Sequence, residues 1–371
     1  MDRRAFGMGA LGLAVAGAAR AQTETPEQVL DRLLKQTRAP ALAGLVVTPD
    51  AIPFRAVAGV RRAGTADRAT ARDRWHLGSN TKAMTAAVYG RLVEKGEAKW
   101  GATLPELFPD LRLHGAWRGA TIEQLMGHRA GLIDQGLTGA AWAPYLQARK
   151  DVVDQRSELA GRALAAPPRG TVGAFAYANA NYIVAGAAIE RITGQSWEDA
   201  LRAELWKPLG VTTGGFGPPQ APDDPWGHGP AFFGAADPGP RPLNPNEDGS
   251  DNPPAVGPAG TAHMAMADYA KWLRLFLTEG GGVLKPDTVT KLATAVPGNG
   301  EPAYALGWGV VERDGDTLLI HSGSNTLWFC TAAISMKRKM AFATFSNDAA
   351  QDGGLKANQL LSNEFKRLFP A

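Results

Sequence analysis

Apolar and polar positions along this chain follow two different periods. Near the start, residues 27–35 carry apolar side chains at helical spacing, which predicts an amphipathic helix. Short apolar runs at 42–48 and 54–60 are bounded by turn residues and predict strands. Residues 79–94 are rich in helix formers, and Gly96 stands where such a helix would stop. The chain therefore opens with a helix, two strands and a second helix.

The middle of the chain, roughly residues 100 to 300, is predicted to be mostly helical. Its helical segments are separated by Pro- and Gly-rich connections and lie at 121–127, 181–193, 197–206 and 267–278. The longest connection, residues 214–260, is dense in Pro and Gly, and a loop of that length inside a compact domain is usually functional or disordered. Strand-like runs return near the end, at 306–312, 317–321, 327–335 and 340–345, before a last helix at 355–368.

Strands at both ends and helices between them predict an α/β fold of the α+β type, with one antiparallel sheet assembled from the two ends. We expect an α/β lobe from about residues 22–100 and 300–371. A mostly helical lobe from about 101–299 would be inserted into it, and a site would lie between the lobes.

Composition supports a single large globular domain. The chain has 371 residues, 44% of them hydrophobic and 20% charged, which is enough apolar material for a sizeable core. The net charge of +3 comes from 39 basic and 36 acidic residues, without a long Lys/Arg run that would follow a phosphate backbone. Nucleic acid is therefore not an expected partner, whereas the oligomeric state stays open.

The first 21 residues differ from the rest. Arg3-Arg4 precede an apolar stretch over 5–19, and Ala19-Arg20-Ala21 offers a cleavage site with small residues, a pattern similar to a twin-arginine export signal. The rival interpretation is a membrane anchor, but about 15 weakly hydrophobic residues fall short of the roughly 20 that span a bilayer. We expect a periplasmic or secreted protein that keeps no membrane span after processing.

Cysteine and histidine patterns argue against a structural or catalytic metal. Cys330 is the only cysteine, so no intrachain disulfide is possible, and its apolar neighbours predict a core position. No HExxH or CxxC motif occurs, and His128 and His263 are interpreted as structural residues.

Ser79 and Lys82 form a Ser-x-x-Lys motif at the predicted start of a helix. A helix places residues three apart on one face, so the Lys82 amine can reach the Ser79 hydroxyl. A serine needs such a neighbour to become a nucleophile, and burial can lower the pKa of a lysine enough for it to accept a proton. Taken alone the motif is weak, because Ser79 would equally suit a solvated helix start that it caps.

Two further motifs follow in order. Tyr177-Ala178-Asn179 and His321-Ser322-Gly323 complete the sequence Ser-x-x-Lys, Tyr-x-Asn, basic-x-Gly. With the segments around them (75–85, 121–132, 177–194 and 258–269), the chain from about residue 27 to its C-terminus resembles the group of class C β-lactamases, D,D-peptidases and family VIII carboxylesterases. The resemblance implies a serine β-lactamase and penicillin-binding-protein fold without cofactor or metal.

The resemblance also implies residue roles. Ser79 would attack a carbonyl and become acylated, with Lys82 and Tyr177 sharing the general-base work, Tyr177 as a phenolate stabilised by positive charge. Asn179 would bind Lys82 and the substrate, and the backbone N–H groups of Ser79 and Ser324 would form the oxyanion hole. His321, in place of the more common lysine, would stand beside a leaving group or substrate carboxylate, with Ser322 and Gly323 in the same wall. That replacement weakens a claim of β-lactamase activity.

Several functions remain open at this point. An exported esterase or amidase acting on small molecules ranks first, a D,D-carboxypeptidase acting on D-alanyl peptides second and a β-lactamase third. The choice among them stays open because substrate preference depends on loops that one sequence does not decode. A different class is a penicillin-binding sensor without catalysis. Tyr177 and His321 also suit ordinary structural roles. Aromatic residues that could line a substrate pocket, or equally fill a core, are Trp226, Phe232, Phe233 and Trp328.

Overall fold

The computed structural model describes residues 24–134, 151–220, 223–229 and 239–369. Its main sheet has six strands in the order β2-β1-β11-β10-β9-β8, and every neighbouring pair is antiparallel. The strands are β1 (Ala41–Val47), β2 (Phe54–Gly59), β8 (Gly309–Arg313), β9 (Asp316–Ser324), β10 (Phe329–Ser335) and β11 (Met340–Ser346). Pairing of β1 with β11 joins the two ends of the chain, so the predicted sheet is confirmed.

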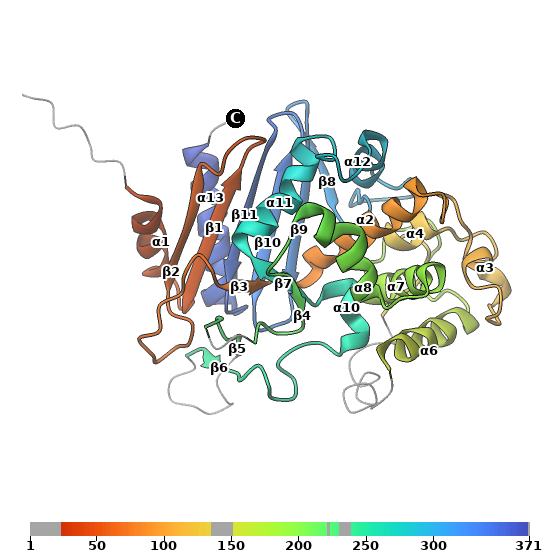
Figure 1. The fold of residues 1–371 in the computed structure, drawn as a ribbon, viewed down its shortest axis with the longest axis horizontal. Helices are drawn as coiled ribbons and strands as arrows, with labels where there is room; N and C mark the ends of the chain where they lie inside the picture. Colours follow the sequence, from red (N-terminus) through yellow and green to blue (C-terminus); the bar gives the residue numbers. More distant parts are fainter. Residues whose placement is uncertain (1–23, 135–150, 221–222, 230–238, 370–371) are drawn as a thin grey trace, which may run out of the picture.

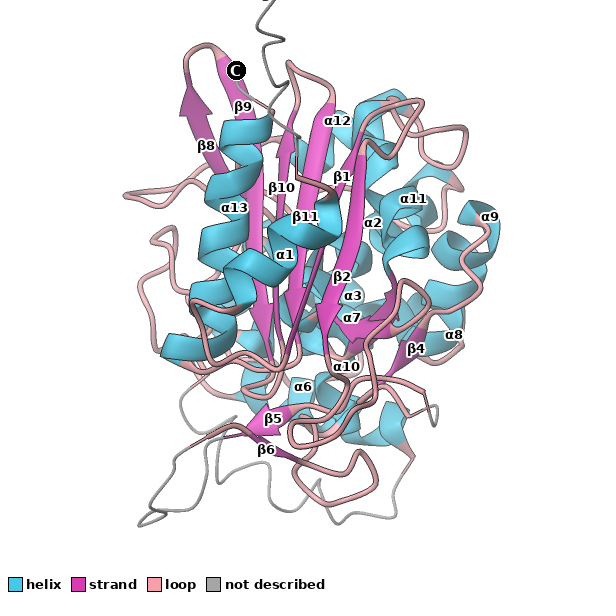
Figure 2. Ribbon diagram, turned by 90° about the vertical axis from the view of Figure 1, so that its left-hand side faces the viewer, coloured by secondary structure: helices cyan, strands magenta, loops and turns pink. Residues whose placement is uncertain are grey.

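Helices cover both faces of this sheet (Figures 1 and 2). Helices α1 (Pro26–Leu34) and α13 (Lys356–Leu368) lie on one face, where Leu42 and Val46 of β1 join their apolar side chains. Alternate residues of the same strand, such as Ala43 and Leu45, join the larger core on the other face. The alternation follows from the period of a strand, because successive side chains point to opposite faces.

The other labelled helices lie on the opposite side of the sheet from α1 and α13 (Figure 1). They are α2 (Thr81–Glu94), α3 (Leu104–Leu107), α4 (Ile122–Met126), α6 (Val152–Ala165), α7 (Asn179–Thr193), α8 (Trp197–Leu201), α9 (Lys207–Leu209), α10 (Gly257–Gly260), α11 (Met266–Leu277) and α12 (Pro286–Ala293). Helix α2 contacts α7, α10 and α12, and the short helix η1 (Gly78–Asn80) directly before it contacts β9 and β10 of the sheet. Nearly all side chains of α2 are buried, which explains why it shows little amphipathic pattern.

Two features differ from the expected organisation. Helix α11 packs against β1 and β11, so this part of the segment expected in the helical lobe covers the sheet instead. A second sheet of three strands, β3 (Arg74–His76), β7 (Ala262–Ala265) and β4 (Gly215–Phe216), was not predicted, because two- to four-residue strands carry too little periodicity.

The long Pro- and Gly-rich connection contains short elements where it is described. These are β4, β5 (His228–Gly229), β6 (Arg241–Pro242), the 3-10 helix η5 (Pro254–Val256) and α10. Further short helices are η1 (Gly78–Asn80), η2 (Gly115–Trp117), η4 (Arg202–Trp206) and η6 (Gln351–Leu355). Phe232 and Phe233 lie outside the described residues.

Other expectations can be compared with the fold. Cys330 is a free, fully buried cysteine on β10, so its predicted core position is confirmed, and burial raises the pKa of its thiol. The predicted export signal, residues 1–21, lies outside the described residues. Within the ranges given above, no helix is long and apolar enough to cross a bilayer, and no group of three or more His, Cys, Asp or Glu side chains is arranged to hold a metal.

Candidate active site

Ser79 occupies the junction between a short strand and a buried helix. It lies in η1, directly before α2, so the prediction that it stands at a helix start is confirmed. The preceding Gly78 has φ +50, a conformation that L side chains rarely adopt, and a Cβ there would lie 2.3 Å from the backbone nitrogen of Ser324. Glycine thus permits the nucleophile segment to approach β9 closely.

Lys82 is one helical turn beyond Ser79 and is completely buried. Its Nζ donates to Ser79 Oγ at 2.9 Å, Asn179 Oδ1 at 2.8 Å and the Ala259 carbonyl at 2.7 Å. Burial lowers the pKa of Lys82 to about 7, although the negative charge of Asp134 acts in the opposite direction. A substantial fraction of the amine is therefore neutral near pH 7 and able to accept the proton of Ser79.

Tyr177 precedes α7 and is the second side chain, after Lys82, that lies beside Ser79. Lys82 Nζ lies 4.8 Å from the centre of the Tyr177 ring. Although 42% of the residue is exposed, desolvation raises the pKa of Tyr177 to about 12, and the nearby Ser79 hydroxyl acts in the opposite direction. The structure therefore favours a protonated phenol, not the phenolate expected from the sequence.

Asn179 begins α7, where the preceding Ala178 has no side chain to cap the helix. The carboxylate of Asp134 replaces such a cap, accepting the backbone N–H groups of Asn179 at 3.0 Å and Ala180 at 2.9 Å. This contact fixes the first turn of α7 and, with it, the amide that binds Lys82. Sequence reasoning missed Asp134 because it lies far from α7 along the chain.

The third motif lies inside β9, which continues to Ser324 and is longer than predicted. His321 is buried, with Nδ1 2.8 Å from the Ser322 carbonyl and Nε2 2.9 Å from the hydroxyl of Tyr304. Burial first, and then the nearby positive Lys82, lower the pKa of His321 to about 3. The resemblance in sequence implies that His321 stands beside a leaving group or substrate carboxylate. In the structure its imidazole is neutral and both of its nitrogens already have partners within the protein.

The backbone around Gly323 forms the opposite wall of the site. A Cβ at Gly323 would lie 2.1 Å from the Leu77 carbonyl and 2.6 Å from the Ser79 nitrogen. This close approach brings the backbone nitrogens of Ser79 and Ser324 near to each other, as an oxyanion hole requires. The exposed Ser322 hydroxyl instead lies 3.3 Å from Thr331 Oγ1.

A cavity of about 320 Å³ opens beside the nucleophile. It is lined by Ser79, Asp134, Asn179, Asn252, Val256, Ala259, Gly260, Ser324, Asn325 and Thr326. Among these described lining residues Asp134 is the only one with an acidic or basic side chain. The walls are therefore polar, with one carboxylate and no cationic side chain of their own.

Two aromatic candidates occupy other places. Trp328 is fully buried and stacks on His76 at 5.5 Å, so it belongs to the core beneath the site. Trp226 lies under Arg62, whose guanidinium carbon is 5.1 Å from the centre of its ring. Neither residue is among those that line the cavity.

The two histidines interpreted as structural are both buried. His263 Nδ1 lies 2.8 Å from the Gly217 carbonyl, whereas His128 supports Tyr177, with 4.4 Å between their ring centres. His128 Nδ1 also accepts the backbone N–H of Ala178 at 3.3 Å. His128 and Tyr304 thus position the second and third motifs, and no motif in the sequence identified that task.

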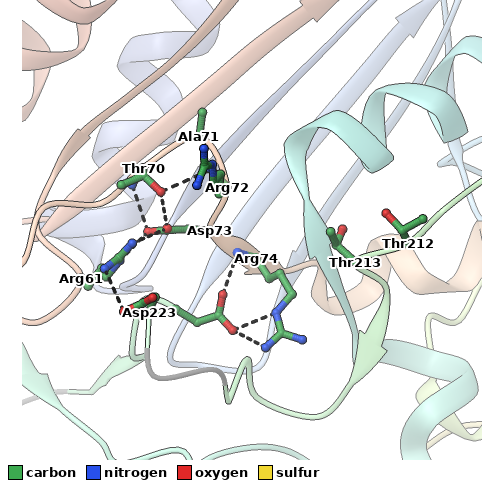
Figure 3. Close-up of a pocket in the computed structure, with 10 residues that line it drawn as sticks. Arg61, Thr70, Ala71, Arg72, Asp73, Arg74, Thr212, Thr213 and Asp223 are labelled. Atoms are coloured by element: carbon green, nitrogen blue, oxygen red, sulfur yellow. Dashed lines mark hydrogen bonds and ion pairs between the residues drawn. The ribbon is translucent and has the colours of Figure 1, made fainter.

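A larger cavity of about 620 Å³ lies among Arg61, Arg74 and residues 70–73, 212–213 and 223–224 (Figure 3). Its buried carboxylates are engaged in ion pairs: Asp73 with Arg61, and Asp224 with Arg74. None of the predicted site residues lines it. We interpret it as a structural ion-pair cluster.

Fold and site together define a protein of the class that carries a serine nucleophile beside a buried lysine. Residues 26–362 match the family described as Beta-lactamase, and the chain belongs to this family of serine hydrolases.

Curated relatives span several chemistries. An unguisins hydrolase of Aspergillus campestris is 30% identical over 67% of this chain and 48% of its own length. Penicillin-binding protein 4 of Amycolatopsis lactamdurans is 27% identical over 68% of this chain and 63% of its length, and esterase EstB of Burkholderia gladioli 29% over 51% and 50%. The chain spans about half the length of the unguisins hydrolases that it matches.

Solved structures share the fold at lower identity. A D-amino acid amidase from Ochrobactrum anthropi SV3 gives a TM-score of 0.73 at 18% identity, covering 92% of this chain and 98% of the amidase. A penicillin-binding protein homologue from Pyrococcus abyssi gives 0.70 at 20% identity, covering 91% and 76%. These likenesses confirm the predicted β-lactamase/transpeptidase-like fold.

Proposed function

We propose that this protein hydrolyses small esters and amides that lack a carboxylate, through an acyl-enzyme on Ser79. The single observation that carries the proposal is the contact of Lys82 with Ser79 Oγ at 2.9 Å, because it pairs the serine with a buried amine whose pKa is about 7. Neutral Lys82 takes the serine proton as Oγ attacks the substrate carbonyl.

The carbonyl oxygen then becomes an oxyanion that the N–H groups of Ser79 and Ser324 stabilise. Collapse of this intermediate breaks the bond to the leaving group, which receives a proton from the Tyr177 hydroxyl, and the proton held on Lys82 returns to Tyr177. Water attacks the acyl-enzyme in the second half, with the same groups moving its proton in the reverse order. The steps use no cofactor.

Charge argues for substrates without a carboxylate. His321 is neutral and has both nitrogens engaged, and Asp134 contributes a negative charge to the cavity wall. A carboxylate on the substrate would lie close to Asp134, whereas Lys82, the cation beside Ser79, is already engaged by Ser79, Asn179 and the Ala259 carbonyl. An esterase or amidase activity is therefore favoured over a D,D-carboxypeptidase or β-lactamase activity, whose substrates carry a carboxylate.

A matched pair of substrates tests the proposal. We expect 4-nitrophenyl butyrate to be turned over with a kcat/KM at least about tenfold above that of the 4-nitrophenyl monoester of succinate, which adds a carboxylate. Ser79→Ala should abolish both turnover and the acyl adduct seen by intact mass, whereas Ser157→Ala, on α6, serves as the matched control. Turnover that survives in Ser79→Ala would refute the nucleophile. Labelling without turnover of any ester would favour a penicillin-binding sensor.

We also propose that the protein is exported by a twin-arginine route. The support is the sequence of residues 1–21, with Arg3-Arg4 before an apolar stretch. Cell fractionation and N-terminal sequencing should find a periplasmic or secreted chain that begins near residue 22. Replacement of both arginines by lysine should retain the uncleaved chain in the cytoplasm, and unchanged export of that variant would contradict the proposal.

A further inference from the structure

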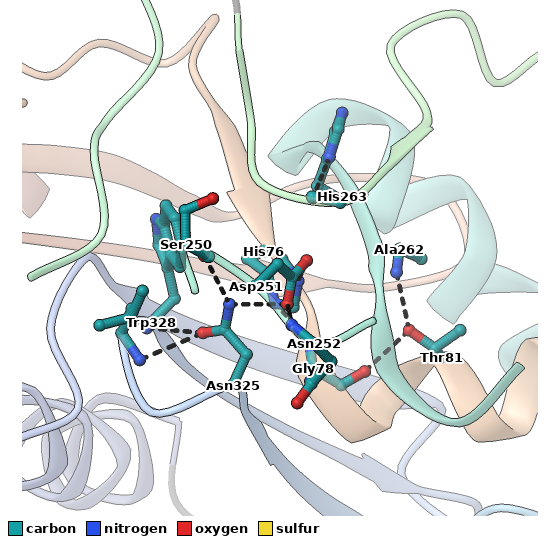
Figure 4. A network of polar contacts seen from close by, with 12 residues as sticks. His76, Gly78, Thr81, Ser250, Asp251, Asn252, Ala262, His263, Asn325 and Trp328 are labelled. Carbon is teal, nitrogen blue, oxygen red and sulfur yellow. Dashed lines mark hydrogen bonds and ion pairs between the residues drawn. The ribbon is translucent and has the colours of Figure 1, made fainter. Parts of the chain in front are cut away.

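A buried histidine supports the backbone of the nucleophile segment. His76 ends β3, and its Nδ1 accepts the backbone N–H of Gly78 at 3.1 Å. Its Nε2 lies 2.8 Å from Oδ2 of Asp251, and both side chains are almost completely buried (Figure 4). Because Nδ1 accepts a hydrogen bond, the proton is on Nε2, and His76 donates it to the carboxylate.

The same carboxylate binds the segment that follows β9. Asp251 Oδ1 accepts from Asn325 Nδ2 at 2.9 Å. Asn325 Oδ1 in turn accepts the backbone N–H groups of Leu327 and Trp328, both at 3.1 Å. The indole of Trp328 stacks on His76, which closes the network on itself. Figure 4 shows Asp251 between the His76 and Asn325 side chains.

These two segments carry the proposed oxyanion hole. Gly78, whose N–H binds His76, immediately precedes Ser79, and Asn325 immediately follows Ser324. We propose that Asp251 is a positioning residue that joins both sides of the oxyanion hole through His76 and Asn325. The inference rests on the proposed function, since it assigns the backbone N–H groups of Ser79 and Ser324 their catalytic task.

The energetic reason is the cost of buried donors without an acceptor. Asp251 accepts from His76 Nε2–H and from Asn325 Nδ2–H, and its Oδ1 also accepts the backbone N–H of Asn252 at 2.7 Å. Without the carboxylate, at least one donor would have to turn away, moving Gly78 or Ser324 with it. Oxyanion stabilisation depends on donors fixed at distances of roughly 3 Å, so a small displacement weakens it. Through Asp251, the long Pro- and Gly-rich connection over residues 214–260 would help to position the oxyanion hole.

The primary test is Asp251→Asn, which keeps the shape but places an amide N–H against one of these donors. We expect kcat per titrated active site to fall about 10- to 100-fold with KM changed by less than about threefold, because the oxyanion exists only in the transition state. Inhibition by phenylboronic acid, which forms a tetrahedral adduct with the serine, should weaken by a similar factor. Asp248→Asn, an exposed aspartate of the same segment, is the matched control and should behave as the wild type.

A double substitution distinguishes positioning from general stability. In Asp251→Asn combined with Asn325→Asp, the new amide accepts from His76 and donates to the new carboxylate, so the links to both partners can form again, while the backbone N–H of Asn252 loses its acceptor. We expect this variant to regain a clear part of kcat and of the boronate affinity relative to Asp251→Asn. Failure to regain either would overturn the proposed pairing.

The remaining outcomes are also decisive. An unchanged kcat per active site and boronate affinity in Asp251→Asn would overturn the inference, even if the melting temperature fell. Because kcat is expressed per titrated site, partial unfolding of a variant does not imitate the effect. A wild-type protein without Ser79-dependent turnover would instead overturn the proposed function, and the two failures are therefore distinguishable.

Discussion

The hydroxyl of Tyr304 lies 2.9 Å from Nε2 of His321, and it is the donor in that contact. The direction follows from the other ring nitrogen, because Nδ1 faces the carbonyl of Ser322 at 2.8 Å and must carry the proton. His321 is thus held as one neutral tautomer by its own strand and by Tyr304. Where the sequence suggested a charge for the substrate, the structure has a packed polar pair.

Tyr304→Phe tests this pair. We expect the free energy of unfolding to fall by about 1–3 kcal/mol, because Nε2 of His321 would remain a buried acceptor without a donor. The measurement is chemical denaturation of the wild type and the variant. In a His321→Leu background the same substitution should cost clearly less, since no acceptor is left. An equal cost in both backgrounds would show that the hydroxyl does not serve His321.

The pH dependence of acylation tests Lys82 as the base. Only the neutral amine can accept the proton of Ser79, so kcat/KM should rise with pH through about 7 and then level off. Tyr177, with a pKa of about 12, stays protonated across this range and should produce no second inflection. His321→Gln provides the control, because the midpoint should persist without that imidazole. A profile that is flat across pH 7 would contradict the assignment.

Asn179→Asp should move that midpoint in a known direction. The new carboxylate would lie where the Asn179 amide oxygen is 2.8 Å from Lys82 Nζ, and an opposite charge favours the protonated amine. We expect the midpoint of the kcat/KM profile to rise by about one pH unit or more. At pH 7 the variant would be slower, and part of the activity should return in more alkaline buffer. An unmoved midpoint would show that residue 179 does not contact Lys82 in the active enzyme.

Gly323→Ala should inactivate the enzyme through the backbone. The added Cβ would lie 2.1 Å from the Leu77 carbonyl, so β9 and the nucleophile segment would have to separate. We expect kcat/KM to fall about 100-fold, the loss that a displacement of about 1 Å can cause at a reacting centre. Gly161→Ala on α6, whose nearest neighbour would be 4.0 Å away, is the control. Activity retained in Gly323→Ala would mean that this approach is not needed.

The sequence by itself determined the sheet, the main helices and the residues of the three motifs. The apolar runs of β1, β10 and β11 and the amphipathic α13 could be predicted because these elements have seven or more residues and pack in the apolar clusters on the two faces of the sheet. The family could be identified from the order of the motif residues, because residue types in a fixed order can be recognised in the sequence alone. These residues are Ser79, Lys82, Tyr177, Asn179 and His321. The electrostatic state of these residues could not be derived from that order.

Only the tertiary structure decided how the motifs are tuned. Burial and charged neighbours set the pKa values of Lys82, Tyr177 and His321, and those surroundings come from distant segments such as α10 and the residues before α7. Asp134 and Asp251 were invisible for the same reason: each acts on a partner that is far away in the sequence. Desolvation and hydrogen-bond geometry are properties of packed neighbours, so they exist only once the chain has folded.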